Sequence, residues 1–474
     1  MATHQNRALG SDKGGGEMRK SIHGEWSSRW AFVMAATGSA VGLGNIWKFP
    51  YMTGQNGGGA FVLVYLLCIA VIGIPIMMAE VLIGRRGRQS PINTMHTLAL
   101  EAGHKPYWQY LGWMGVTAGF IILSYYSVIA GWTVAYMVRT ATGQFTDATL
   151  DGVQSIFAQF VGDPEHLLAW HTVFMVMTMV VVARGVQGGL ERAVRFLMPA
   201  LFLLLVILVG YATNTGEFTK AFRYLFTLHL HELTTASVLA AMGQAFFSLS
   251  LGMGAIMVYG SYLPHGASIA RTSITVALAD TIVALLAGLA IFPLVFANGL
   301  APGQGPGLIF VTLSLAFGHM DGGVLFGTLF FALLVFAAWT SSISLIEPAV
   351  AYLVENVGLR RINATLVVGV GAWLLGLLTV FSFNVWSDVR PLSMFEIFRD
   401  KTFFELLDYV ASNILLPLGG LFIALFAGWI MTRDSTLDEL SLGDNWRYQT
   451  WRVLVRYVTP LAVAIVFLNK IHII

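Results

Sequence analysis

Residues 37–50 read TGSAVGLGNIWKFP and lie inside an apolar stretch, at about 30–53, that is long enough to cross a bilayer. Three glycines stand in its middle, namely Gly38, Gly42 and Gly44. Each glycine weakens a helix by about 1 kcal/mol relative to alanine. Ser39 and Asn45 add polar groups at a depth where lipid offers them no partner. The sequence therefore predicts a spanning helix that is interrupted at mid-membrane and binds a polar ligand there.

A second interruption, FSLSLGMG at 247–254, lies in another apolar segment. Small residues in a single segment could simply let a neighbouring helix pack closely. Two interrupted helices in corresponding halves of a chain are instead typical of the central site of a secondary transporter. The pair therefore favours a binding site over close packing.

The composition excludes an ordinary soluble domain. Of the 474 residues, 56% are hydrophobic and only 11% are charged, which is typical of an integral membrane protein. The net charge of +2 gives no sign of a nucleic-acid partner. The single cysteine, Cys68, cannot form an internal disulfide and is expected to be a small buried residue. Residues 1–25 are polar and lack the apolar stretch of a signal peptide, so we expect a flexible cytoplasmic tail.

The apolar runs predict an all-α integral membrane protein with eleven spans. They lie at about 30–53, 59–83, 107–138, 167–183, 193–212, 237–262, 272–297, 323–354, 363–382, 403–431 and 451–469. With the N-terminus in the cytoplasm, the inner loops are basic and the outer loop after span three is acidic, as the positive-inside rule requires. The basic residues are Arg85, Arg86, Arg88, Lys105, Arg184, Arg192, Arg271, Arg360, Arg361, Arg433 and Arg447, and the acidic ones are Asp147, Asp151, Asp163 and Glu165. An odd number of spans then places the C-terminus outside.

The positions of the two interruptions suggest an internal repeat inside one transmembrane domain, residues 26–474. Repeat one would cover about 30–212, repeat two about 237–431, and an extra helix about 451–469. Because each repeat has five spans, the second enters the membrane from the opposite side. This is the inverted 5+5 arrangement, with spans one and six discontinuous.

Oxygen atoms gather at the interruptions and in one further span. Unwound backbone offers the carbonyls of Gly38, Ala40 and Val41, and Asn45 adds a side-chain oxygen. Further polar groups are Gln244, Ser248 and Ser250 in span six and Thr340, Ser341 and Ser342 in span eight. Sodium prefers oxygen ligands and accepts irregular geometry. A single serine or threonine more often bonds to its own helix, so the signal is the occurrence of three clusters in three spans.

Asp280 lies well inside span seven, where an unpaired carboxylate costs about 2.5 kcal/mol or more. It needs a cation or a proton. We interpret it as a sodium ligand; the alternative is a protonated carboxyl group that is hydrogen-bonded in the bundle. Glu80, near the inner end of span two, is expected to be structural, reaching the interface or pairing with an arginine.

Lys48 and Asp408 carry opposite charges near the predicted outer ends of their spans. They are candidates for a gate closed by an ion pair, although each could also reach the interface separately. His229 and His231 show no ligand spacing, and no site for a metal such as zinc is expected. No nucleophile–base pair is apparent, so we expect no enzyme activity.

Five motifs carry a resemblance to a known family. They are GSAVGLGNIWKFP at 38–50, NGGGAF at 56–61, YY at 125–126, GQAFFSLSLGMG at 243–254 and TSSISLIEP at 340–348. They resemble the neurotransmitter:sodium symporter family, in its bacterial amino-acid transporter branch, and the similarity covers almost the whole chain from Trp26. The resemblance implies alternating access, in which spans one, two, six and seven rock against three, four, eight and nine.

The resemblance implies two sodium sites and one amino-acid site. Sodium site one would use Ala40, Asn45, Ser248 and Asp280 with the substrate carboxylate, and site two Gly38, Val41, Ala337, Thr340 and Ser341. The substrate would contact Ser39, Ala40, Leu43, Gly44, Ile122, Tyr126, Phe247, Ser248, Ser250, Met253, Ser341 and Leu345, with Phe247 as the outer cap. The gates would be Lys48 with Asp408 outside, and Trp26 with Glu355 inside.

Departures from the family pattern narrow the substrate. Gly42 stands where monoamine carriers have an aspartate, which favours substrates that bring their own carboxylate. Asp280 replaces the asparagine of chloride-dependent members, so its fixed charge implies chloride independence and makes proton counter-transport plausible. Met253 replaces a phenylalanine and could yield to bulky apolar or aromatic side chains.

The inner gate and the C-terminal end also depart from the family. The N-terminal arginine of the family aligns with His23, although Lys20 is near and could reach Glu355. A twelfth span is missing, as in many bacterial members.

The sequence therefore predicts a sodium-coupled, chloride-independent symporter of a neutral, hydrophobic or aromatic amino acid. It would lie in the bacterial inner membrane among lipids, with no organic cofactor and no obligatory protein partner. The alternative is a membrane sensor that keeps the ligand site without transport. The tails and loops are too short to hold a signalling module, which speaks against that alternative.

Overall fold

The computed structural model describes residues 19, 21–215, 217–299 and 308–470. Every regular element in this part is a helix, so the predicted all-α fold is confirmed. Most of the predicted tail, residues 1–25, lies outside the described residues.

Nine helical segments in the described part are long and apolar enough to cross a membrane. They are Gly59–Gly87, Pro106–Ala141, Pro164–Ala183, Val186–Ala212, Ile269–Ala297, Gly323–Val357, Arg361–Ser382, Phe403–Ile430 and Trp446–Asn469. They correspond to nine of the eleven predicted spans, with ends that differ by a few residues. The other two, spans one and six, are missing from this set because both helices are interrupted, as predicted.

The helices inside the nine segments have the following bounds. They are α3 (Gly59–Cys68), α4 (Ile74–Gly87), α6 (Gln109–Ala141), α8 (Pro164–Ala183), α9 (Arg192–Ala212), α13 (Ile269–Ala297), α15 (Gly323–Tyr352), α16 (Arg361–Ser382), α17 (Phe403–Asp408), α18 (Leu416–Leu425), α20 (Trp446–Val453) and α21 (Thr459–Lys470).

Five further helices lie in loops where the sequence analysis placed none. They are α5 (Pro91–Glu101), α7 (Leu150–Gly162), α10 (Phe218–Phe226), α14 (Ser314–Gly318) and α19 (Arg433–Leu440). All are too short to span a membrane, which is why a search for long apolar runs missed them. Their start signals are nevertheless in the sequence: Pro91 occupies the first turn of α5, and the Thr149 hydroxyl accepts a hydrogen bond from the Gly152 amide at the start of α7.

The first interruption follows α1 (Arg29–Ala40). Val41 has extended backbone angles, with φ −70° and ψ 107°, so the helix ends there. It resumes as a π-helical turn, Gly44–Lys48, and continues as α2 (Phe49–Gln55). The break therefore occupies residues 41–43, within the glycine-rich stretch that predicted it.

The second interruption separates α11 (Thr235–Ser248) from α12 (Ala255–Ser261). Ser250, Gly252 and Gly254 have positive φ angles of 54°, 83° and 74°. Glycine adopts this left-handed conformation without the steric cost of a Cβ. The Ser250 hydroxyl donates to the carbonyl of Ser39 at 2.8 Å, which connects the two interruptions.

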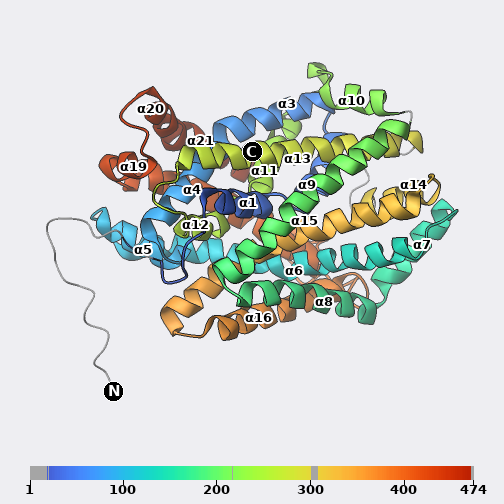
Figure 1. Cartoon of the computed structure of the whole chain (residues 1–474), viewed down its shortest axis with the longest axis horizontal. Helices are drawn as coiled ribbons and strands as arrows, with labels where there is room; N and C mark the ends of the chain where they lie inside the picture. Colours follow the sequence, from blue (N-terminus) through green and yellow to red (C-terminus); the bar gives the residue numbers. More distant parts are fainter. Residues whose placement is uncertain (1–18, 20, 216, 300–307, 471–474) are drawn as a thin grey trace.

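The two broken segments lie side by side and run in opposite directions. α1 contacts α12, and α2 contacts α11, near the centre of the molecule in Figure 1. The helices α4 and α13 pack on this pair, while α6, α8, α15 and α16 pack on one another. The antiparallel pairing agrees with the inverted arrangement predicted for spans one and six.

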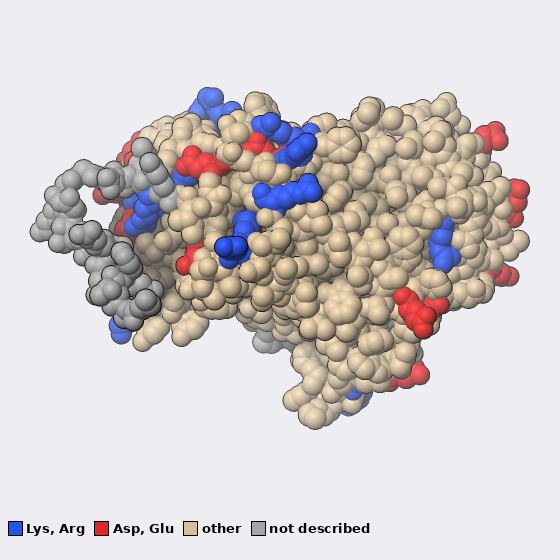
Figure 2. All heavy atoms as spheres, turned by 60° about the horizontal axis from the view of Figure 1, so that its bottom comes forward, with Lys and Arg blue, Asp and Glu red and all other residues tan. Residues whose placement is uncertain are grey.

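Charged side chains separate along the long axis of the molecule. On the face shown in Figure 2, most lysine and arginine side chains lie toward the end that carries α5 and α19. Acidic side chains predominate at the opposite end. We call these the basic end and the acidic end.

Candidate functional site

A cavity of about 370 Å³ lies between the two interruptions. Its walls are Ser39, Ala40, Gly42, Gly44, Ile122, Tyr126, Phe247, Ser250, Met253, Ser341 and Leu345. Ten of these eleven residues belong to the set expected to contact substrate. Gly42 was missed from that set, and Leu43 and Ser248 of the set lie just outside the cavity wall.

Two glycines keep this cavity open. A Cβ atom on Gly42 would lie 2.6 Å from the hydroxyl oxygen of Ser341 and 3.0 Å from that of Tyr126. A Cβ on Gly44 would lie 2.9 Å from the ring of Phe247. A side chain at either position would therefore fill the cavity or displace its wall.

The first oxygen cluster brings together Asn45, Ser248 and Asp280, three of the four residues expected at sodium site one. The Asn45 amide nitrogen donates to the Asp280 carboxylate at 2.7 Å and to the Ser248 hydroxyl at 3.1 Å. The Ser248 hydroxyl in turn donates to Asp280 at 2.5 Å. Tyr65 adds a hydroxyl 3.1 Å from that of Ser248. Ala40, the fourth expected residue, lines the adjacent cavity.

Asp280 is fully buried, and its carboxylate accepts hydrogen bonds from side chains of other helices. Its charge in a membrane interior needs a cation or a proton nearby. The Asn45 side-chain oxygen accepts a hydrogen bond from the Gly42 amide at 3.1 Å, and the side-chain nitrogen faces Asp280. A half-turn of the Asn45 amide group would exchange the two atoms and present the oxygen to a cation beside Asp280. The cluster can therefore supply several oxygen ligands to one sodium ion.

The second oxygen cluster lies where α15 passes the first interruption. The Ser341 hydroxyl lies 3.4 Å from the carbonyl oxygen of Gly38 and 3.2 Å from that of Val41. The Thr340 hydroxyl lies 3.1 Å from the carbonyl oxygen of Ala337 on its own helix. All five residues expected at sodium site two thus lie at this contact between α1 and α15.

Several polar contacts at the interruptions were not identified from the sequence as supports. Glu80 was expected to be structural, at the interface or paired with an arginine; it is instead fully buried, and its carboxylate accepts a hydrogen bond from the Gly252 amide at 2.7 Å. The Gln244 side chain donates to the carbonyl of Gly44 at 3.1 Å, and Ser39 donates to Ser344 at 2.8 Å. These contacts satisfy backbone and hydroxyl groups that a break in the helix leaves without a partner.

Phe247 separates the central cavity from a second cavity of about 650 Å³ toward the acidic end. Lys48 and Asp408 both line this second cavity. The Lys48 ammonium lies 4.0 Å from the centroid of the Phe247 ring, a cation–π contact. Asp408 accepts hydrogen bonds from Tyr125 at 3.1 Å and from Ser412 at 2.8 Å. Lys48 therefore braces the cap, a contact that the charges alone could not reveal, and the ion-pair gate stays a prediction.

Toward the basic end the site is closed by Trp26, which is 2% exposed. Its indole nitrogen donates to the carbonyl of Tyr259 at 3.0 Å. Next to it, His23 lies 2.9 Å from the Glu355 carboxylate, which also accepts hydrogen bonds from Ser90 and Asn93. His23 is therefore the partner of Glu355, and Lys20, the other candidate, lies outside the described residues.

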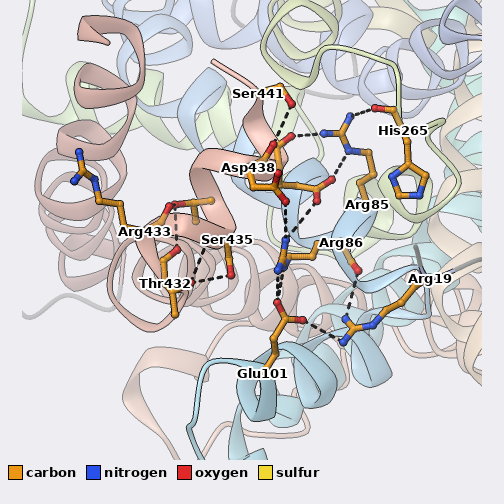
Figure 3. Close-up of polar contacts among 12 residues, drawn as sticks. Arg19, Arg85, Arg86, Glu101, His265, Thr432, Arg433, Ser435, Asp438 and Ser441 are labelled. Carbon is orange, nitrogen blue, oxygen red and sulfur yellow. Dashed lines mark hydrogen bonds and ion pairs between the residues drawn. The ribbon is translucent and has the colours of Figure 1, made fainter. Parts of the chain in front are cut away.

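A second group of contacts at the basic end joins α4 to its neighbours (Figure 3). Arg85 binds the side chain and the carbonyl of Glu439 on α19, and it donates to the carbonyl of His265. Arg86 pairs with Glu101 on α5. Burial, and after it the charge of Arg88, lowers the pKa of His265. These contacts hold the basic end closed beneath the site.

Comparisons with known proteins extend over nearly the whole chain. The model of the Sodium:neurotransmitter symporter family matches residues 23–151 and 153–474. A Bacillus subtilis protein described as the sodium-dependent transporter YhdH is 40% identical to this chain, over 95% of this chain and 98% of its own length. A sodium-dependent transporter of Haemophilus influenzae is 34% identical over 94% of this chain and 98% of its own.

A solved structure with a ligand is also similar. The crystal structure of MhsT in complex with L-phenylalanine matches with a TM-score of 0.86 and 43% sequence identity. The match covers 94% of this chain and 99% of that chain.

Proposed function

This chain belongs to the sodium:neurotransmitter symporter family, and from that premise we propose that it imports a neutral amino acid together with sodium ions. The resemblance inferred from the motifs is thereby confirmed, and so is the expectation of a transporter rather than an enzyme. The observation that carries the proposal is the convergence of both helix interruptions on one cavity, with the buried Asp280 hydrogen-bonded to Asn45 of the first interruption.

The two oxygen clusters suit two sodium ions. Asn45, Ser248 and Asp280 would hold one ion next to the cavity, where the substrate carboxylate could complete its ligands. The carbonyls of Gly38 and Val41 with the hydroxyls on α15 would hold the other. A carboxylate shared between substrate and ion couples the two binding events, because each lowers the free energy of the other.

Chloride independence follows from Asp280 in this proposal. The carboxylate supplies a fixed negative charge beside the cation, so no anion has to be recruited. When sodium leaves, the same carboxylate needs another positive partner in the low-dielectric interior. A proton taken up from the cytoplasmic side is the simplest one, and its release on the outer side would amount to proton counter-transport.

We propose a hydrophobic or aromatic amino acid as substrate. Beyond the backbone groups and hydroxyls at one side, the cavity wall consists of Ile122, Phe247, Met253 and Leu345. Gly42 leaves no carboxylate for a substrate amine to pair with, so the substrate has to bring its own. The similarity to MhsT, which was crystallised with L-phenylalanine, supports this choice.

A substitution of Met253 tests the size of the substrate side chain. Met253 is 4% exposed, and replacing it by phenylalanine adds volume to a packed wall, which costs about 1–3 kcal/mol when the bound side chain is large. We expect Met253→Phe to weaken binding of phenylalanine by roughly tenfold or more while leucine and alanine bind nearly as before. Competition against a radiolabelled amino acid measures the binding of phenylalanine, leucine and alanine. Met253→Leu keeps the volume and is the control; equal losses for all three amino acids in Met253→Phe would contradict the assignment.

The inner closure gives a further prediction. The His23 and Glu355 side chains are only 3% and 6% exposed, so this contact is shielded from water. We expect His23→Ala to speed hydrogen exchange of the backbone amides at 21–28 about tenfold, because a hydrogen bond to a charged group contributes about 1.5 kcal/mol. Mass spectrometry of peptic peptides measures the rate. His104→Ala removes an exposed histidine and serves as the control; unchanged exchange in His23→Ala would show that His23 does not hold the segment.

We place the protein in the bacterial inner membrane with the basic end in the cytoplasm. The arginines of the loops that join the spans support this orientation. Alternating access would then move α1, α4, α12 and α13 against the group formed by α6, α8, α15 and α16. Residues 26–474 would act as one transport domain, with no obligatory protein partner.

Uptake into reconstituted vesicles tests the proposal. An imposed inward sodium gradient should drive accumulation of a hydrophobic amino acid above its external concentration, and the rate should not change when gluconate replaces chloride. Accumulation of the same size without any sodium gradient would overturn coupling. Sodium-dependent binding without accumulation would instead support the sensor alternative.

A further inference from the structure

A wide groove opens on the outer surface of the bundle at the basic end, between α9 and α15. Its volume is about 770 Å³, and its wall includes Arg184, Arg192, Ala193, Phe196, Phe336 and Trp339. The Phe196 side chain is 68% exposed, and only 33% of the most apolar part of its span, Val186–Ala212, is buried inside the protein. The groove therefore faces the surrounding lipid and is separate from the central cavity.

Two arginines at the mouth of this groove have no acidic partner in the described part of the chain. Within the described residues, neither the Arg184 nor the Arg192 guanidinium makes a hydrogen bond or an ion pair, and no acidic side chain lines the groove. The neighbouring Glu191 is buried and pairs with Arg195. By contrast, Arg85 at the same end of the molecule is bound by Glu439. The mouth thus carries two positive charges that can accept an anion.

Below the arginines the groove is apolar. Phe196 follows Arg192 by four residues on α9, which puts it roughly 6 Å further along the helix axis and deeper in the membrane. Phe336 and Trp339 on α15 face the same space. A free anion would use only the mouth, whereas an amphiphile with an anionic head group and an acyl chain would use both parts.

We propose that this groove binds one anionic phospholipid of the leaflet at the basic end. Its phosphate lies between Arg184 and Arg192, and one acyl chain lies against Phe196, Phe336 and Trp339. Basic pockets between membrane helices hold anionic head groups in this way, and each nearby arginine contributes about 1 kcal/mol, or about fivefold in affinity. The site is independent of the transport site, and its test needs no transport.

Native mass spectrometry of the purified, delipidated full-length protein tests this. Phosphatidylglycerol and phosphatidylcholine with the same acyl chains are titrated separately. We expect the wild type to prefer phosphatidylglycerol by about tenfold or more. The double variant Arg184→Gln/Arg192→Gln should weaken phosphatidylglycerol binding about 25-fold and leave phosphatidylcholine unchanged. The control is Arg271→Gln/Arg360→Gln, two exposed arginines at the starts of α13 and α16, which should retain the preference.

A second variant tests the apolar part of the site. Ala193→Trp fills the groove and leaves both arginines in place, and it should weaken phosphatidylglycerol binding at least fivefold. Glycerol 3-phosphate, which has the anionic group without acyl chains, should not compete at millimolar concentration. The proposal is overturned if the double arginine variant keeps the lipid preference. It is also overturned if Ala193→Trp binds phosphatidylglycerol as the wild type does, or if glycerol 3-phosphate displaces the lipid, which would indicate a simple anion site.

Discussion

Asp280→Asn should reduce sodium-driven uptake in chloride-free medium by roughly a hundredfold. The substitution removes the fixed negative charge from a fully buried cluster, and breaking a buried charge pair by removing one partner costs about 3–5 kcal/mol. The amide keeps the size and some hydrogen bonds of the carboxylate, so the fold should survive. Uptake of a radiolabelled hydrophobic amino acid into vesicles, with gluconate as the only anion, measures the loss.

The same variant should recover part of its activity when chloride replaces gluconate. The hydroxyl groups of Tyr65 and Ser248 contact the Asp280 carboxylate and can donate hydrogen bonds to an anion that substitutes for it. Asp151→Asn, which neutralises an exposed carboxylate on α7, is the control and should behave as the wild type. Wild-type uptake that needs chloride, or full activity of Asp280→Asn without it, would contradict the role assigned to Asp280.

Gly252→Ala should destabilise the protein by about 2–4 kcal/mol. Gly252 has a φ of +83°, which a residue with a Cβ adopts at a cost of roughly 1 kcal/mol. The added Cβ would also lie 2.6 Å from the carbonyl oxygen of Leu416 and 3.1 Å from the amide nitrogen of Gly420, and backbone atoms of α18 cannot rotate away. Overpacking of this kind costs a further 1–3 kcal/mol. Thermal unfolding in detergent measures the effect.

Gly358→Ala provides a matched control for that experiment. Gly358 has a similar φ of +71°, but nothing lies within 4 Å of its added Cβ. Gly358→Ala should lose only the stability that corresponds to the positive φ angle, roughly 1 kcal/mol. Equal stability losses in the two variants would show that close packing of the second interruption against α18 is unimportant.

The sequence predicted the eleven spans and both interruptions because the signals are local. A glycine-rich segment inside a run of about 20 apolar residues weakens the helix regardless of what packs against it. The short helices α7 and α10 were missed because the analysis followed long apolar runs. Both helices lie in loops between the predicted spans, where tertiary contacts do more than hydropathy to decide whether a helix forms.

Most of the cavity wall was expected, but its supports were not. Glu80 was expected to reach the interface or to pair with an arginine, because its position near the inner end of span two says nothing about the Gly252 amide that it binds. The cation–π contact of Lys48 with the Phe247 ring was not expected either, because charge signs say nothing about an aromatic partner. In each case the partner lies far away in the sequence, so only the folded chain could identify it.

The central claim is that sodium and an amino acid occupy the two interruptions together. A thermal-shift screen of the twenty amino acids against the purified protein, in sodium chloride and in potassium chloride, tests it most directly. One or more hydrophobic amino acids should stabilise the protein only in sodium, by about 2.7 kcal/mol at a hundredfold excess over Kd, and not in Asp280→Ala. Equal stabilisation in both salts, or stabilisation that persists in Asp280→Ala, would contradict the claim.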